Sequence, residues 1–88
     1  MANHASAKKR IRQTLKRTAR NRDIRTRVRT HVKRVRAAIA AGDARLAQAS
    51  LPGAIREIEK AVTKGVYHRK TGSRYVSRLV GRVAALKG

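Results

Sequence analysis

An 88-residue chain with 24 lysines and arginines, four acidic residues and a net charge of +20 is expected to need a polyanionic partner. The length suits one domain over residues 1–88, and the absence of cysteine excludes a disulfide framework and thiolate chemistry. No apolar run has the length of a membrane span or the character of a signal peptide, which favours a cytoplasmic protein.

The first expected element is a helix over residues 6–41, with Ser6 as its N-cap and Gly42 just beyond its end. At about 1.5 Å per residue it is about 54 Å long, so it must project beyond a domain of this size. Its second half carries an apolar stripe that predicts a face docked on other helices: Ile24, Val28, Val32, Val35 and Ile39. Its first half carries cations on nearly every side, and Ile11 and Leu15 lie off the stripe.

Like charges crowd the first half of this helix. Four cations follow one another at i, i+4: Lys8, Arg12, Lys16 and Arg20. Each such pair destabilises an isolated helix by about 0.2–0.5 kcal/mol. Lys9 and Arg10 also lie in the first turn, where the helix dipole favours negative charge. Phosphates packed around the helix would remove both penalties, so we expect the first half to fray when free and to lie within a polyanion.

Two further helices are predicted, over residues 43–64 and 70–86. Asp43 is the expected N-cap of the second, and Pro52 inside it predicts a kink or a short break near residues 52–53. The expected apolar faces are Leu46, Ala47, Leu51, Ala54, Ile55, Ile58, Ala61 and Val62, then Val76, Leu79, Val80, Val83 and Leu86. Short connections favour antiparallel neighbours, hence an all-α, up-down-up three-helix bundle with a long first helix projecting beyond it.

A second basic cluster marks the start of the third helix, where unpaired amides and the helix dipole attract anions. Arg69 and Lys70 supply charge there, Thr71 and Ser73 supply hydroxyl donors, and Gly72 would allow close approach of a nucleic-acid backbone. The up-down-up arrangement predicts that this cluster and the start of the first helix lie at the same end of the bundle.

Catalytic and metal sites are not predicted. His4, His31 and His68 are too scattered for zinc, and the four acids offer no convincing carboxylate pair. Phosphate-loop and dinucleotide fingerprints are absent. We therefore expect neither an enzyme nor a cofactor, and no small-molecule substrate. His31 is expected to pack at the edge of the stripe. Tyr67 and Tyr75 could stack on bases, and Tyr67 could equally well cover the core.

Several short motifs follow one another along the chain: Ala2-Asn3, Ser6-Ala7, Lys9-Arg10, Ala41-Gly42-Asp43, Lys64-Gly65-Val66, His68-Arg69-Lys70, Arg74 and Ser77-Arg78-Leu79. Their order and spacing resemble the S-twenty family of bacterial small-subunit ribosomal proteins over essentially the full chain. The resemblance implies a three-helix bundle with an extended first helix, held against 16S ribosomal RNA near the bottom of the small subunit. There it would help to fold and stabilise the RNA, with no catalytic role. Thr71-Gly72 departs from the family pattern and predicts a delayed start of the third helix.

Folded RNA can surround a basic rod, whereas a straight DNA duplex offers one face at a time. We therefore expect a structural ribosomal RNA-binding protein, with contacts mainly to phosphates and 2′-hydroxyls and with no homo-oligomer. The predicted RNA contacts are Asn3, His4, Ser6, Lys8, Lys9, Arg10, Arg12, Lys16, Arg17, Arg20, Asn21, Arg22, Arg25, Arg29, His68, Arg69, Lys70, Thr71, Ser73, Arg74 and Arg78. The alternatives are a nucleoid-type DNA-compacting protein and a basic amphipathic membrane binder, the latter needing an exposed apolar stripe.

Overall fold

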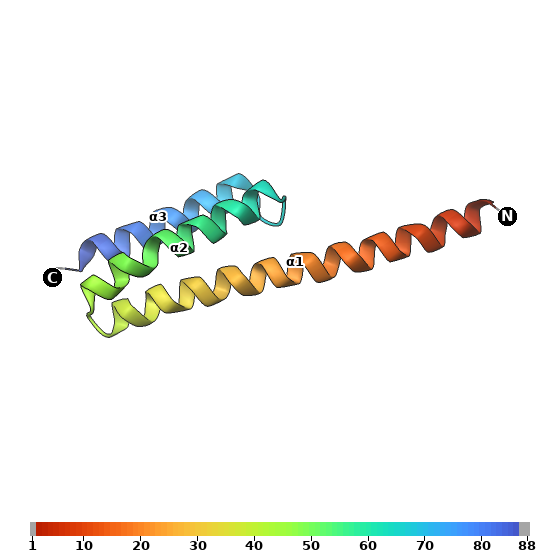
Figure 1. Cartoon of the computed structure of the whole chain (residues 1–88). Helices are drawn as coiled ribbons and strands as arrows, with labels where there is room; N and C mark the ends of the chain where they lie inside the picture. The colour runs from red at the N-terminus through yellow and green to blue at the C-terminus, as the bar shows by residue number, and fades with distance from the viewer. Residues whose placement is uncertain (1, 87–88) are drawn as a thin grey trace.

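The computed structural model describes residues 2–86, with side chains from residue 6 onward, and folds this part of the chain into three helices (Figure 1). Helix α1 is Ala2–Ala40, α2 is Ala44–Thr63 and α3 is Arg69–Ala85. Helices α1 and α3 run in the same direction, and α2 runs against both (Figure 1). The predicted all-α, up-down-up arrangement with a long first helix is confirmed.

The molecule is elongated because α1 extends far beyond the other two helices (Figure 1). Its extents are 66 × 21 × 15 Å and its radius of gyration is 17.7 Å. A compact chain of this length would have a radius of gyration of about 12 Å. We name residues 6–20 the projecting segment.

Helix α1 starts at Ala2, four residues before the predicted start, so Ser6 lies inside the helix and is not its N-cap. Alanine is the strongest helix former, and Ala2, Ala5 and Ala7 flank Ser6 on both sides. The helix propensity of these alanines outweighs the capping preference of a single serine.

The connection between α1 and α2 is three residues long and is closed by hydrogen bonds. Gly42 has a φ of 69°, in the left-handed region that glycine adopts most readily. The amide of Asp43 donates to the carbonyl of Ala38 at 2.9 Å and so closes the end of α1. The carboxylate of Asp43 accepts a hydrogen bond from the amide of Leu46 at 3.0 Å, which confirms its predicted role as the N-cap of α2.

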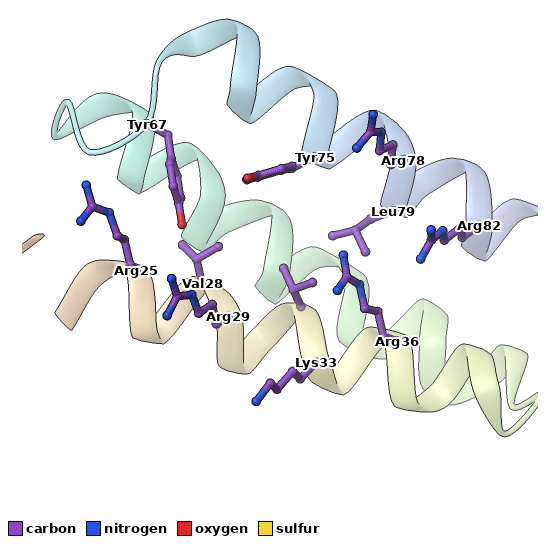
Figure 2. A pocket seen from close by; sticks show the side chains of 11 residues that line it. Arg25, Val28, Arg29, Lys33, Arg36, Tyr67, Tyr75, Arg78, Leu79 and Arg82 are labelled. Carbon is purple, nitrogen blue, oxygen red and sulfur yellow. The ribbon is translucent and has the colours of Figure 1, made fainter. Parts of the chain in front are cut away.

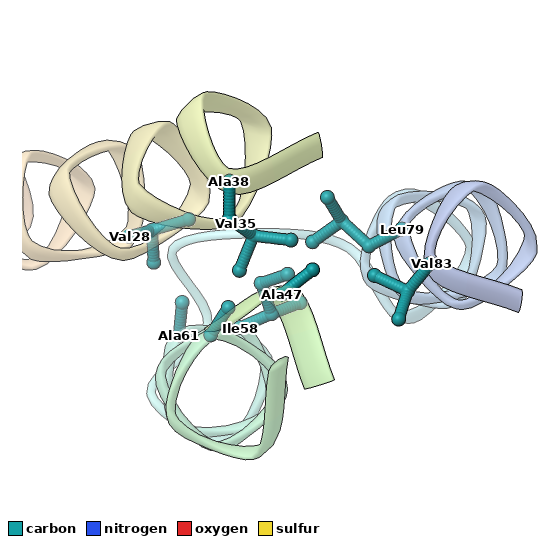
Figure 3. Packing of buried hydrophobic residues seen from close by; sticks show 9 residues of the cluster. Val28, Val35, Ala38, Ala47, Ile58, Ala61, Leu79 and Val83 are labelled. Carbon is teal, nitrogen blue, oxygen red and sulfur yellow. The ribbon is translucent and has the colours of Figure 1, made fainter. Parts of the chain in front are cut away.

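The core lies where α2 packs against facing sides of α1 and α3 (Figure 3). All five residues of the predicted α1 stripe contact it. Its buried members are Val28, Val35, Ala38, Ala47, Ala54, Ile58, Ala61, Leu79 and Val83. Leu46 and Val80 were expected to face the core, but they are 51% and 41% exposed. Both lie at the margin of their apolar face, and a core built largely from alanine and valine is too narrow to cover them.

The predicted break near residues 52–53 is wrong, because α2 runs as one helix through Pro52. Ala47 before the proline and Ala54 after it are both fully buried in the core. Packing on either side therefore holds the two halves in line, although a proline within a helix costs about 3 kcal/mol. The kink stays a prediction.

Close packing between α2 and α3 depends on Gly72, which is buried. A Cβ atom at this position would overlap a methyl group of Val62, whereas at the exposed Gly81 it would meet open space. We expect G72A to lower the free energy of unfolding by about 1–3 kcal/mol through overpacking. The matched variant G81A is expected to raise it by about 0.5–1 kcal/mol, because alanine favours helix. Thermal unfolding followed by circular dichroism measures both, and equal effects of the two variants would contradict this packing.

Candidate nucleic-acid interface

The projecting segment extends past the ends of α2 and α3 (Figure 1), and none of its residues belongs to the core or is among the apolar residues packed against it. Its apolar residues Ile11 and Leu15 are 59% and 65% exposed. Its seven cations are all exposed: Lys8, Lys9, Arg10, Arg12, Lys16, Arg17 and Arg20. Within the described part of the chain the one ion pair lies elsewhere, between Lys60 and Glu57 on α2 at 3.9 Å. The charge of the segment is therefore not compensated by the protein.

Two further predicted contacts, Asn3 and His4, lie at the start of α1, but their side chains lie outside the described residues. Ser6, Arg22, Arg25 and Arg29 are exposed. Asn21 is half-buried, and its side-chain oxygen accepts a long hydrogen bond of 3.4 Å from Arg20.

A groove of about 540 Å³ separates α1 from α3, and we name it the α1–α3 groove (Figure 2). One rim is a ridge of cations on α1: Arg25, Arg29, Lys33 and Arg36. Arg78 and Arg82 of α3 form the other rim, and the floor is apolar: Val28, Val32 and Leu79. Six cations and no acid line this groove, so it is strongly attractive to anions.

Two tyrosines complete the groove. Tyr67 is half-buried against the core, which supports its role as a lid, and Tyr75 is 37% exposed. Their rings meet edge to face, with centroids 5.7 Å apart and planes at 85° (Figure 2). This is a favourable geometry for an aromatic pair, so Tyr67 holds Tyr75 in place at the mouth of the groove.

The start of α3 differs from the prediction in two ways. Helix α3 begins at Arg69 and not later, because the Nδ1 atom of His68 accepts a hydrogen bond from the amide of Lys70 at 3.1 Å and caps it. Gly72 faces α2 and is buried, so it cannot offer its backbone to a ligand. The other predicted residues here, Lys70, Arg69, Ser73 and Arg74, are exposed, and Thr71 is half-buried.

The two predicted basic clusters do not meet. Tyr67, next to the start of α3, lines the same groove as Arg25 in the middle of α1. From Arg25, α1 extends for a further 23 residues toward its N-terminus. The starts of α1 and α3 do lie at the same end, as predicted, because the two helices run in the same direction (Figure 1), but the start of α1 lies far beyond that of α3. Equal helix lengths would have brought them together, but α1 has 39 residues and α3 has 17.

The α1–α3 groove brings together three of the predicted contacts, Arg25, Arg29 and Arg78. Five other residues that line it were not among the predicted contacts: Lys33, Arg36, Arg82, Tyr67 and Tyr75. The cations form ridges at helical spacing that are visible in the sequence. The sequence does not show which two ridges face each other, because that depends on how the helices pack.

The sequence profile of the family described as Ribosomal protein S20 matches residues 2–84 of this chain. The chain belongs to the ribosomal protein S20 family. A small ribosomal subunit protein bS20 from Geotalea daltonii is 56% identical over 86 residues, covering 98% of this chain and 99% of the relative. The relative from Paramagnetospirillum magneticum is 54% identical over 87 residues, covering 99% and 97%, and that from Koribacter versatilis is 52% identical over 85 residues, covering 97% and 96%.

Membership of the S20 family confirms the resemblance found in the short motifs, and over nearly the whole chain. It also confirms that the chain is not an enzyme, because S20 proteins are structural ribosomal proteins. In the part of this S20 chain that the structure describes, no helix combines the length and the hydrophobicity needed to cross a lipid bilayer.

Proposed function

We propose that this protein is a structural constituent of the small ribosomal subunit in the cytoplasm. It binds 16S ribosomal RNA, mainly through the phosphate backbone, and stabilises the folded RNA. The observation that carries this proposal is the projecting segment, whose cations point to all sides and form no ion pair within the described residues. The small ribosomal subunit named for the relatives supplies a polyanion of the required kind.

The shape of the projecting segment favours folded RNA over duplex DNA. A rod charged on one face would suit a single groove, but cations around the whole circumference need phosphates on several sides at once. Packed RNA helices provide such surroundings, and A-form helices are contacted mostly through phosphates and 2′-hydroxyls. The bundle of α1, α2 and α3 anchors the segment and leaves it free to enter the RNA (Figure 1).

Hydroxyl-radical footprinting on full-length 16S ribosomal RNA tests this proposal, with genomic DNA as competitor. We expect protections on several RNA helices that are distant in the secondary structure, and we expect them to persist in excess DNA. Equal displacement by DNA and by RNA would instead indicate a nucleoid-type DNA-compacting protein. Anionic vesicles serve as a control, because helicity gained with vesicles but not with RNA would indicate a membrane binder.

A further inference from the structure

The α1–α3 groove has a composition that phosphate binding alone does not require. Its apolar floor residues are Val28, Val32 and Leu79, and Tyr75 of α3 also lines it, pointing toward Tyr67 and 37% exposed (Figure 2). Its six cations come from α1 and α3, the two helices that flank the groove. A nucleotide has the matching division, with a flat, weakly polar base on one side and an anionic phosphate on the other. The projecting segment lacks such a floor, since Ile11 and Leu15 are isolated among cations on a convex surface.

We infer that the α1–α3 groove binds an unpaired nucleotide of the RNA, an inference that rests on the RNA-binding function proposed above. The base lies on the apolar floor and stacks against Tyr75, and the phosphates on either side of it contact the two basic rims. Unstacked bases of single-stranded RNA commonly stack on aromatic side chains and on arginine planes. Stacking on Tyr75 needs little reordering of the protein, because the edge-on contact with Tyr67 already holds the ring.

The size of the groove is compatible with a single nucleotide. A volume of about 540 Å³ lies within the range of about 300–1,000 Å³ that pockets for single small molecules have. An RNA duplex is far too wide to enter and would rest on the rims, leaving the apolar floor uncovered. A helix of a partner protein is about 10–12 Å wide with its side chains, and only a strongly acidic helix would complement six cations. An unpaired nucleotide covers the apolar floor with its base and places a phosphate at each basic rim.

A substitution of Tyr75 removes base stacking but leaves the charge of the groove unchanged. We expect Y75L to bind full-length 16S ribosomal RNA about 5- to 150-fold more weakly, the loss typical of one stacked base. The slope of log K against log salt should stay as in the wild-type protein, because no cation is removed. Y75F, which keeps the ring, should bind within about twofold of the wild-type protein. V80A removes a side chain that is also partly exposed on α3 but does not line the groove, so it should bind as the wild-type protein does.

A pair of charge variants tests whether RNA reaches the rims. R78Q/R82Q removes two exposed cations from one rim, and R45Q/R56Q removes two exposed cations from α2, outside the groove. We expect the first variant alone to lower the salt slope, by about 0.7–0.9 per lost contact. If R78Q/R82Q weakens binding and Y75L does not, an RNA duplex rests on the rims and the inference is overturned. If neither variant weakens binding, the groove is not occupied by RNA and the inference is overturned as well.

If Y75L misfolds, its affinity does not report on stacking, so a second measurement uses the wild-type protein. Ultraviolet irradiation of the wild-type complex with 16S ribosomal RNA should cross-link the peptide that carries Tyr75 to a nucleotide that is unpaired in the RNA. A cross-link to a paired nucleotide, or none at this peptide, overturns the inference. Failure of the proposed function is distinguishable, since the wild-type protein would then show no footprint on 16S ribosomal RNA that survives competition by DNA.

Discussion

Raising the salt concentration from about 50 to about 200 mM is expected to weaken binding to 16S ribosomal RNA by about three to five orders of magnitude, if six to ten phosphates are neutralised. The projecting segment offers seven exposed cations and the α1–α3 groove six more, so the surface can supply that number of contacts. Each contact releases condensed counterions from the RNA, and added salt opposes that release. Filter binding over a series of potassium concentrations measures the effect.

The salt series should give a straight line of log K against log salt with a slope between about −5 and −9. Magnesium is held constant throughout so that the RNA stays folded. A slope near zero would contradict the assignment of the cations to phosphate binding. A steep slope with equal affinity for unrelated RNA would retain the electrostatic mechanism and contradict specific binding to 16S ribosomal RNA.

Removing charge from one side of the projecting segment is expected to affect the free and the bound protein in opposite directions. The variant is K8Q, R12Q, K16Q and R20Q. In the free protein it relieves three repulsive i, i+4 contacts, each worth about 0.2–0.5 kcal/mol, so the helical signal in circular dichroism should rise. In the complex it removes up to four phosphate contacts, so the affinity at 0.15 M salt should fall by about two to three orders of magnitude.

A control variant changes the net charge equally but leaves the projecting segment intact. It carries R45Q, R56Q, K60Q and K64Q, all exposed and outside both basic surfaces. We expect its affinity for the RNA to fall by less than about tenfold, because only long-range attraction is lost and salt screens it. A similar loss of affinity in both variants would mean that net charge, and not the position of the cations, determines binding.

The fold was largely predictable because periodicity reports which side of a helix is buried. The stripe from Ile24 to Ile39 identified the docked half of α1, and Gly42 with Asp43 identified the first connection. The errors concern residues whose own structural preference is outweighed by the neighbouring sequence or by packing. Ser6 has the right chemistry for a cap but lies among alanines that continue the helix, and Pro52 disfavours a helix that packing on both sides maintains.

The candidate site was only partly predictable, because its groove is formed by two helices that are distant in the sequence. Arg29 and Arg78 each belong to a visible ridge, but only packing around α2 turns the two ridges toward each other. Gly72 was misjudged for the same reason. A glycine beside cations suggests close approach of a ligand, whereas the structure assigns the space above it to Val62 of the same chain. The projecting segment was predictable because it depends on no tertiary contact.

Helix α2 touches both α1 and α3, whereas α1 and α3 hardly touch each other. Most tertiary contacts thus join segments that follow one another along the chain, through connections of only a few residues. Helical proteins with such local topology fold within microseconds to milliseconds, much faster than a ribosome adds the next amino acid. The bundle is therefore expected to fold within milliseconds of the release of the chain. Assembly of the particle then begins with a folded bundle, and the projecting segment takes its final form within the RNA.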